Sequence, residues 1–168
     1  MPQHHPHLTA QCRLATPLGP LMAAATDQGL AGLWFDDQAH HPGASAVPEQ
    51  PGHPMLQAAA QDLADYFAGR PAGQRRVALD LHGTPFQRAV WQALLALPHG
   101  STSTYGRIAA QAGAPAAVRA AGAAIGRNPV SILVPCHRVL GQDGSLTGYA
   151  GGLHRKQALL RLEGIMPG

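Results

Sequence analysis

A short apolar run that ends at a proline and leads into three reactive side chains limits most strongly what this chain can fold into. Residues 132–134 have the composition of a short buried strand, and Pro135 ends it because its ring fixes φ and removes a backbone donor. Cys136, His137 and Arg138 follow directly. This order predicts a nucleophile beside a possible base at the end of a strand, whereas an inert core thiol is the alternative reading of a buried cysteine.

Charge is divided unevenly along the 168 residues. Residues 1–100 carry five arginines against seven acids, and residues 101–168 carry seven cations against two acids. The basic half also contains Cys136. A polyanion such as nucleic acid is therefore the partner that this half predicts, although a solvated basic face would give the same count.

Cysteine use and hydropathy indicate a cytoplasmic protein. Only Cys12 and Cys136 are present, too few for a disulfide framework, so both thiols are expected to be reduced. No apolar run approaches the roughly 20 residues that span a bilayer, and the first residues lack the regions of a signal peptide. His4, His5 and His7 have no neighbouring ligand that would make a specific metal site.

The first half has the pattern of a small α+β scaffold. The first dozen residues are rich in His and Pro and are expected to be disordered, although Cys12 and Leu14 are placed on a first strand. Residues 21–25 and 30–35 predict a hairpin, residues 36–52 a loop, and residues 54–68 an amphipathic helix. The alternation from Val77 to Leu81 predicts one more, half-buried strand.

The second half is mainly helical. Thr84, Pro85 and Gln87 predict a capped helix to about Leu97, with Trp91 in its core. A helix from Thr104 to Ala112 and another from Pro115 to Ile125 predict a helix-turn-helix. The second of these is almost entirely Ala and Gly, with Arg119 as its one long cation. This composition argues against reading of the major groove by polar side chains and favours shape-based or minor-groove docking.

Glu163 occupies an unfavourable position at the end of a helix expected over residues 153–163. An anion there faces the negative end of the helix dipole, which costs about 0.3 to 1 kcal/mol. Either Glu163 is a surface residue that tolerates this cost, or its position serves an acid-base network.

Four segments carry a resemblance to a known family. Residues 128–130 (Asn-Pro-Val), 135–139 (Pro-Cys-His-Arg-Val), 148–153 (Gly-Tyr-Ala-Gly-Gly-Leu) and 162–164 (Leu-Glu-Gly) closely resemble the O6-alkylguanine-DNA alkyltransferases. The resemblance is strong from Thr84 onward and looser before it. It implies an α+β protein with a small ribonuclease-H-like domain without nuclease activity, residues 1–82, and a mainly helical domain with a winged-helix-like helix-turn-helix, residues 83–168.

The family resemblance also implies a reaction, in which an O6-alkylguanine is flipped out of duplex DNA and its alkyl group passes irreversibly to Cys136. O4-alkylthymine is a further possible substrate. His137 would relay the proton of Cys136 through a water to Glu163. Asn128 would tie the helix-turn-helix to the active-site strand through backbone hydrogen bonds, and Tyr105 would donate a proton toward N3 of the departing guanine.

Contacts to DNA follow from the same resemblance. Arg119 would enter the base stack in place of the flipped nucleotide. The other residues expected at the DNA surface are Tyr105, Ala120, Ala121, Gly122 and Arg127. The base pocket would be lined by Val139, Tyr149, Ala150 and the backbone of Cys136. No cofactor is expected, and the chain is expected to act as a monomer because it contains no dimerising heptad repeat.

Two departures from the family and three alternatives bear on this reading. Ala150 stands where some members carry serine, and Cys12 with scattered histidines does not reproduce the zinc site that some relatives carry in the first half. A non-catalytic binder of alkylated bases would lack Cys136. A cysteine hydrolase would turn over, and adjacent residues on a strand point to opposite sides, which makes a direct Cys-His pair awkward. A transcription factor would need a dimer interface.

Overall fold

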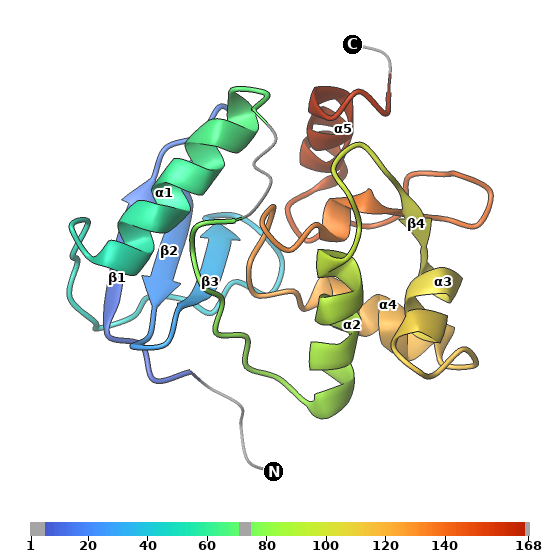
Figure 1. Ribbon diagram of the computed structural model, residues 1–168, viewed down its shortest axis with the longest axis horizontal. Helices are drawn as coiled ribbons and strands as arrows, with labels where there is room; N and C mark the ends of the chain where they lie inside the picture. The colour runs from blue at the N-terminus through green and yellow to red at the C-terminus, as the bar shows by residue number, and fades with distance from the viewer. Residues whose placement is uncertain (1–5, 71–74, 167–168) are drawn as a thin grey trace. The chain divides into compact units, whose positions relative to one another are not determined.

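A computed structural model describes residues 6–70 and 75–166, and its contacts divide the chain into two compact units (Figure 1). The first unit is Met1–His82 together with Pro129–Ser131, and the second is Gly83–Asn128 together with Ile132–Gly168. The architecture is the mixed α+β class predicted from the sequence. Within the described residues, no helix is both long and apolar enough to span a bilayer.

The first unit is an antiparallel sheet with one helix on it. Strands β1 (Ala10–Leu14), β2 (Leu21–Ala25) and β3 (Leu30–Phe35) lie in the order β1-β2-β3, so the predicted hairpin is confirmed. Helix α1 (Pro54–Phe67) begins with its proline in the first turn and packs against all three strands (Figure 1). The core lies between α1 and the sheet, where almost every strand residue is buried.

Two expectations for the first unit are wrong. Residues 10–12 are not disordered, because each pairs with a residue of β2. Residues 1–5 lie outside the described residues. The alternating stretch 77–81 forms one isolated bridge and no strand: Leu30 donates to the Ala78 carbonyl and accepts from the Asp80 amide, both at 2.8 Å.

A late segment of the chain forms one isolated bridge with β3 of this sheet. The Leu33 amide donates to the Pro129 carbonyl at 2.8 Å, and the Ser131 amide donates to the Leu33 carbonyl at 2.9 Å. These bonds place Val130 in a parallel bridge with Leu33. The three residues between the helix-turn-helix and the cysteine segment therefore belong to the first unit.

Three helices form the body of the second unit, namely α2 (Pro85–Leu95), α3 (Tyr105–Gln111) and α4 (Val118–Gly126). The predicted capping box of α2 is confirmed, since Thr84 and Gln87 each bond the other's amide, at 3.1 and 3.0 Å. Trp91 is buried as expected.

Helices α3 and α4 form the predicted helix-turn-helix, but α4 begins three residues later than expected. Pro115 and Ala116 lie in a turn, and Ala117 caps α4 with a non-helical ψ of 47°. The Ala117 amide bonds the Ala114 carbonyl at 2.8 Å, so this stretch makes a tight turn of its own before the helix starts.

The cysteine segment joins the remaining elements of the second unit. Strand β4 (Ser103–Thr104) pairs in parallel with β5 (Val139–Leu140), and the 3₁₀ turn η1 (Cys136–Arg138) leads into β5. Helix α5 (Leu153–Leu162) packs against η1.

The strand expected at residues 132–134 is a turn instead. Ile132 has a φ of 72°, a left-handed conformation that a β-branched residue rarely adopts and that lies outside the β region of a regular strand. The segment is buried as expected, but the chain bends through it, so the cysteine does not follow a straight strand.

Candidate active site

Cys136 opens a 3₁₀ turn that is almost wholly buried. Cys136 is 6% exposed, and His137 is 0% exposed. The Arg138 amide closes the turn on the Pro135 carbonyl at 3.1 Å. Because a 3₁₀ helix has three residues per turn, successive side chains point about 120° apart. The side chains of Cys136 and His137 therefore diverge. The sequence predicted that the two would make a poor direct pair, but it gave a strand as the reason, whereas the structure has a turn.

Glu163 is the acceptor of three hydrogen bonds. His137 approaches with Nε2 at 2.5 Å from Oε2, while Arg138 Nε and the Gly100 amide donate to Oε1 at 2.7 and 3.0 Å. Glu163 follows α5 as its C-cap residue and is buried. Of the two readings that the sequence left open, the network is therefore the one that the structure shows, and its donors offset the unfavourable helix dipole.

The charges of this network balance before any reaction. Burial by itself would raise the pKa of Glu163, but the hydrogen bonds from His137 and Arg138 hold that pKa well below its usual range. Burial lowers the pKa of His137, although Glu163 opposes this effect. A charged carboxylate can only accept, so Nε2 carries the proton of a neutral imidazole and Nδ1 is its basic nitrogen. Arg138 neutralises Glu163.

The thiol of Cys136 lies among groups that favour its charged form. Burial raises its pKa, while the Asn128 side chain and the positive charge of Lys156 act in the opposite direction. Asn128 also donates from Nδ2 to the Val134 carbonyl at 2.8 Å, which ties the end of α4 to the residues before the cysteine. Because burial is the larger effect, the resting form is the thiol, and its proton must leave during any reaction.

Tyr105 is brought to the cysteine segment by the short parallel sheet. Ser103 pairs with Val139 and Thr104 with Leu140, so Tyr105, which follows β4 directly, lies beside the segment after Cys136. Its hydroxyl is 2.6 Å from the Thr147 hydroxyl.

The three expected pocket residues lie on the segment that links η1 to α5. Val139 is buried, and Tyr149 and Ala150 are half-buried. The Lys156 ammonium donates to the Val139 carbonyl at 2.6 Å and to the Thr147 carbonyl at 3.3 Å, so it holds both ends of this segment together.

The residues expected at the DNA surface divide on α4. Arg119 and Ala120 are exposed in its first turn, and Arg127 is exposed at its C-cap. Gly122 faces the Tyr105 ring: a Cβ at this position would lie 3.6 Å from Cδ1. Ala121 is wholly buried, so its side chain has no exposed surface to present to DNA. The helix buries one face, and Ala121 lies on it.

Sequence reasoning missed Arg138, Lys156 and Thr147. Arg138 was noted only as part of a motif, yet it is the cation that balances Glu163. Lys156 is the chain's one lysine, among eleven arginines, and it is wholly buried. The presence of a single lysine in the sequence could have indicated a special role for Lys156. No feature of the sequence indicated Thr147, because only the fold places it against Tyr105.

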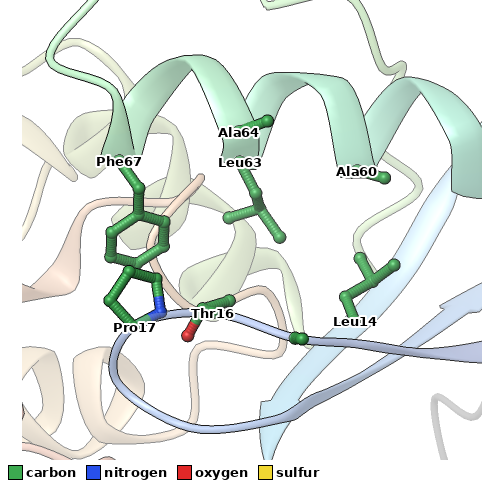
Figure 2. A pocket seen from close by; sticks show the side chains of 8 residues that line it. Leu14, Thr16, Pro17, Ala60, Leu63, Ala64 and Phe67 are labelled. Atoms are coloured by element: carbon green, nitrogen blue, oxygen red, sulfur yellow. The ribbon is translucent and has the colours of Figure 1, made fainter.

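Other parts of the described residues offer no comparable chemistry. Within residues 6–70 and 75–166, no group of three or more His, Cys, Asp or Glu side chains could hold a metal ion. A cavity of about 150 Å³ lies in the first unit between α1 and the turn after β1 (Figure 2). Its lining is mostly apolar, contains no titratable group, and has one hydroxyl, that of Thr16, which donates to the Gly19 carbonyl: Leu14, Ala15, Thr16, Pro17, Ala60, Leu63, Ala64 and Phe67.

Comparison with known proteins finds one family along both halves. Residues 13–81 match the ribonuclease-like domain of 6-O-methylguanine DNA methyltransferase, and residues 85–165 match its DNA binding domain. The methylated-DNA–protein-cysteine methyltransferase of Mycobacterium bovis is 48% identical over 88% of each chain. That of Salmonella typhimurium is 46% identical over 92% of this chain and 95% of its own. The Mycobacterium tuberculosis OGT, solved in complex with DNA, is 45% identical over 92% of each chain, with a TM-score of 0.84.

Proposed function

Because this chain belongs to the 6-O-methylguanine DNA methyltransferase family, we propose that it repairs DNA by moving the alkyl group of an O6-alkylguanine onto Cys136. The observation that carries this proposal is the buried thiol at the start of η1, with His137, Glu163 and Arg138 forming a neutral network beside it. A network of this kind can take up the proton that a buried thiol must lose.

The proposed reaction is a direct displacement at the alkyl carbon. The sulfur of Cys136 forms a bond to that carbon, and the carbon–O6 bond breaks with its electron pair staying on guanine. The thiol proton passes through a water to Nδ1 of His137, and the imidazolium is stabilised by Glu163. Tyr105 donates its proton to N3 of the departing guanine.

Thiolate formation by itself accounts for little of the rate. A free cysteine with a pKa near 8.5 is about 3% ionised at pH 7, so complete ionisation gains roughly 30-fold. The remainder must come from holding the alkyl carbon in line with the sulfur and from stabilising the leaving base. The second task is the one that Tyr105, Val139, Tyr149 and Ala150 would perform in a pocket for the flipped base.

We infer that the second unit binds the duplex through α4. Its first turn presents Arg119 beside Ala120, and the small residues of the helix leave room for close approach to a groove. Flipping the base costs a few kcal/mol of unstacking, and Arg119 entering the stack would recover part of it. Arg127 at the other end of α4 would contact the backbone, and Asn128 would couple this surface to the cysteine.

A thioether is not hydrolysed, so each chain would react once, as a monomer and without a cofactor. We place the protein in the cytoplasm, where its acceptor thiol stays reduced. We propose O4-alkylthymine as a second substrate.

The test is the intact mass of the protein after incubation with excess duplex DNA that contains O6-methylguanine. We expect one added methyl group per chain, on Cys136, and no further addition with time. Cys136→Ser should bind the same DNA and gain no methyl group. Binding without any adduct on the native chain would instead indicate a non-catalytic lesion binder, and repeated turnover would indicate a hydrolase.

A further inference from the structure

The Tyr105 hydroxyl has a partner that the reaction described above does not use. Thr147 Oγ1 lies 2.6 Å from Tyr105 Oη, within hydrogen-bond distance, and either oxygen can be the donor. Tyr105 is the first residue of α3, and Thr147 lies on the segment between β5 and α5. Both are half-buried, so the contact is sheltered from water on part of its surface.

Thr147 is fixed from its other side by Lys156. The buried ammonium donates to the carbonyls of Thr147 and Gly148 at 3.3 and 3.4 Å, and to the carbonyl of Val139 at 2.6 Å. The backbone that carries the Thr147 hydroxyl is therefore tied to the strand that follows the cysteine turn. Gly122 on α4 lies against the Tyr105 ring, so the phenol is held between α4 and this segment.

The proton count decides which hydroxyl donates. Each hydroxyl has one proton and can accept through its lone pairs. If Tyr105 gives its proton to guanine, its oxygen must accept from Thr147. The threonine hydroxyl is far less acidic than a phenol, so it keeps its proton while Tyr105 loses one. Because a hydrogen bond to an anionic oxygen is about twice as strong as one to a neutral oxygen, this bond strengthens as the base leaves.

We infer that Thr147 is a positioning residue for alkyl transfer: its hydroxyl aims the Tyr105 proton at the departing base and stabilises the phenolate that forms. The inference rests on the proposed function. In the full step the sulfur–carbon bond forms, the carbon–O6 bond breaks, and the Tyr105 proton moves to guanine N3. Once the base has left, the phenolate takes a proton from solvent, and His137 releases to solvent the one it took from the thiol.

The experiment compares single-turnover transfer rates on saturating duplex DNA that contains O6-methylguanine. Thr147→Val keeps the shape and removes the hydroxyl, and we expect it to slow transfer about 10-fold, as loss of a hydrogen bond to a partly charged oxygen should. The affinity for the DNA should change by less than about 2-fold, since the bond strengthens only during the reaction. Thr147→Ser retains a hydroxyl and should recover most of the rate. Thr16→Val is the matched control, because that threonine bonds only within a turn of the first unit.

Repeating the Thr147→Val change in the Tyr105→Phe variant distinguishes a positioning role of Thr147 from a general structural effect. With Tyr105→Phe, the Thr147→Val change should have no further effect on the transfer rate, because the two residues act through one proton. An equal loss in both backgrounds, or an unaltered rate for Thr147→Val alone, would overturn the inference. If Thr147→Val does not fold, Thr147→Ala applies the same criterion. A native chain that transfers nothing would instead overturn the proposed function, on which the inference depends.

Discussion

Two cysteines, one in each unit, are buried to a similar degree but have different neighbours. Cys12 on β1 is 4% exposed and Cys136 is 6% exposed, and burial raises the pKa of both. They differ in what lies next to them. Glu49 raises the pKa of Cys12 further, whereas Asn128 and Lys156 pull that of Cys136 down. The hydrogen bond from Asn128 and the sign of the neighbouring charge distinguish the two thiols, whose residues are almost equally buried.

The same contrast holds for buried carboxylates. Asp62 in the first unit accepts from the backbone amides of Arg76 and Val77, both at 3.0 Å, so it fixes a loop to α1. Glu163 in the second unit accepts from a titratable side chain, His137. A carboxylate bound to amides that never change charge is structural, whereas one bound to an imidazole can respond to a proton. Asp80 of the first unit also pairs with an imidazole, that of His82 at 3.0 Å, so the contrast holds for the buried carboxylates Asp62 and Glu163 and not for every carboxylate of the two units.

The largest expected difference is between the two thiols themselves. Cys136→Ala should abolish alkyl transfer, because it removes the sulfur that forms the new bond, while Cys12→Ala should transfer one methyl group per chain at the native rate. Intact mass followed by peptide mapping after reaction with methylated DNA measures both. A methyl group found on Cys12 would break the comparison.

The second test compares the two carboxylates. Glu163→Gln leaves Arg138 as a buried cation without its anion, which should lower the free energy of unfolding by about 3 to 5 kcal/mol. It should also slow transfer by roughly 100-fold or more, since the imidazolium loses its stabilising charge. Asp62→Asn should lower stability while leaving the transfer rate of the folded protein unaltered. Urea denaturation and single-turnover kinetics give the two quantities, and a rate loss in Asp62→Asn would show that the first unit takes part in the chemistry.

The third test compares one exposed arginine of each unit, Arg119 and Arg13. Arg119→Ala should slow repair of duplex DNA about 10-fold, because no side chain then enters the base stack in place of the flipped nucleotide. It should affect reaction with a free O6-alkylguanine base far less. Arg13 forms a surface ion pair with Asp36, and Arg13→Ala should alter neither reaction. Equal losses on duplex and free base would remove the stacking role of Arg119.

The smallest effect concerns stability in acid. Folding lowers the pKa of both His137 and Glu163, so the unfolded chain binds more protons than the folded chain at low pH. The contribution of His137 to the free energy of unfolding is therefore fully present above the unfolded histidine pKa of about 6.5. As the pH drops below that value, the contribution decreases by up to about 1.4 kcal/mol per pH unit. The contribution of Glu163 decreases in the same way below about pH 4.3. Urea denaturation between about pH 7.5 and 5.5 measures the first fall. His137→Asn should flatten it, and an equally steep fall in that variant would assign it to other groups.

Local patterns in the sequence predicted the elements whose hydrogen bonds join residues a few positions apart in the chain. The capping box of α2 joins residues three apart, and the hairpin of β2 and β3 turns within four residues, so both could be predicted from spacing alone. The motif around Cys136 likewise predicted a nucleophile beside a possible base, because the residues themselves carry that chemistry, whereas the role of Glu163 was predicted only through the family resemblance.

Tertiary structure decided what depends on residues far apart in the chain. Ile132 has a left-handed φ inside a run whose composition is that of a strand, and in a helix of mostly Ala and Gly the packing of α4 against α2 and α3 decides that Ala121 is buried. Glu163 is disfavoured by the dipole of its own helix, and its stabilising partners are His137, 26 residues away, Arg138, 25 residues away, and Gly100, 63 residues away. Sequence spacing specifies bonds that a helix turn or a hairpin closes, whereas a buried charge finds its partners only when the whole unit has folded around it.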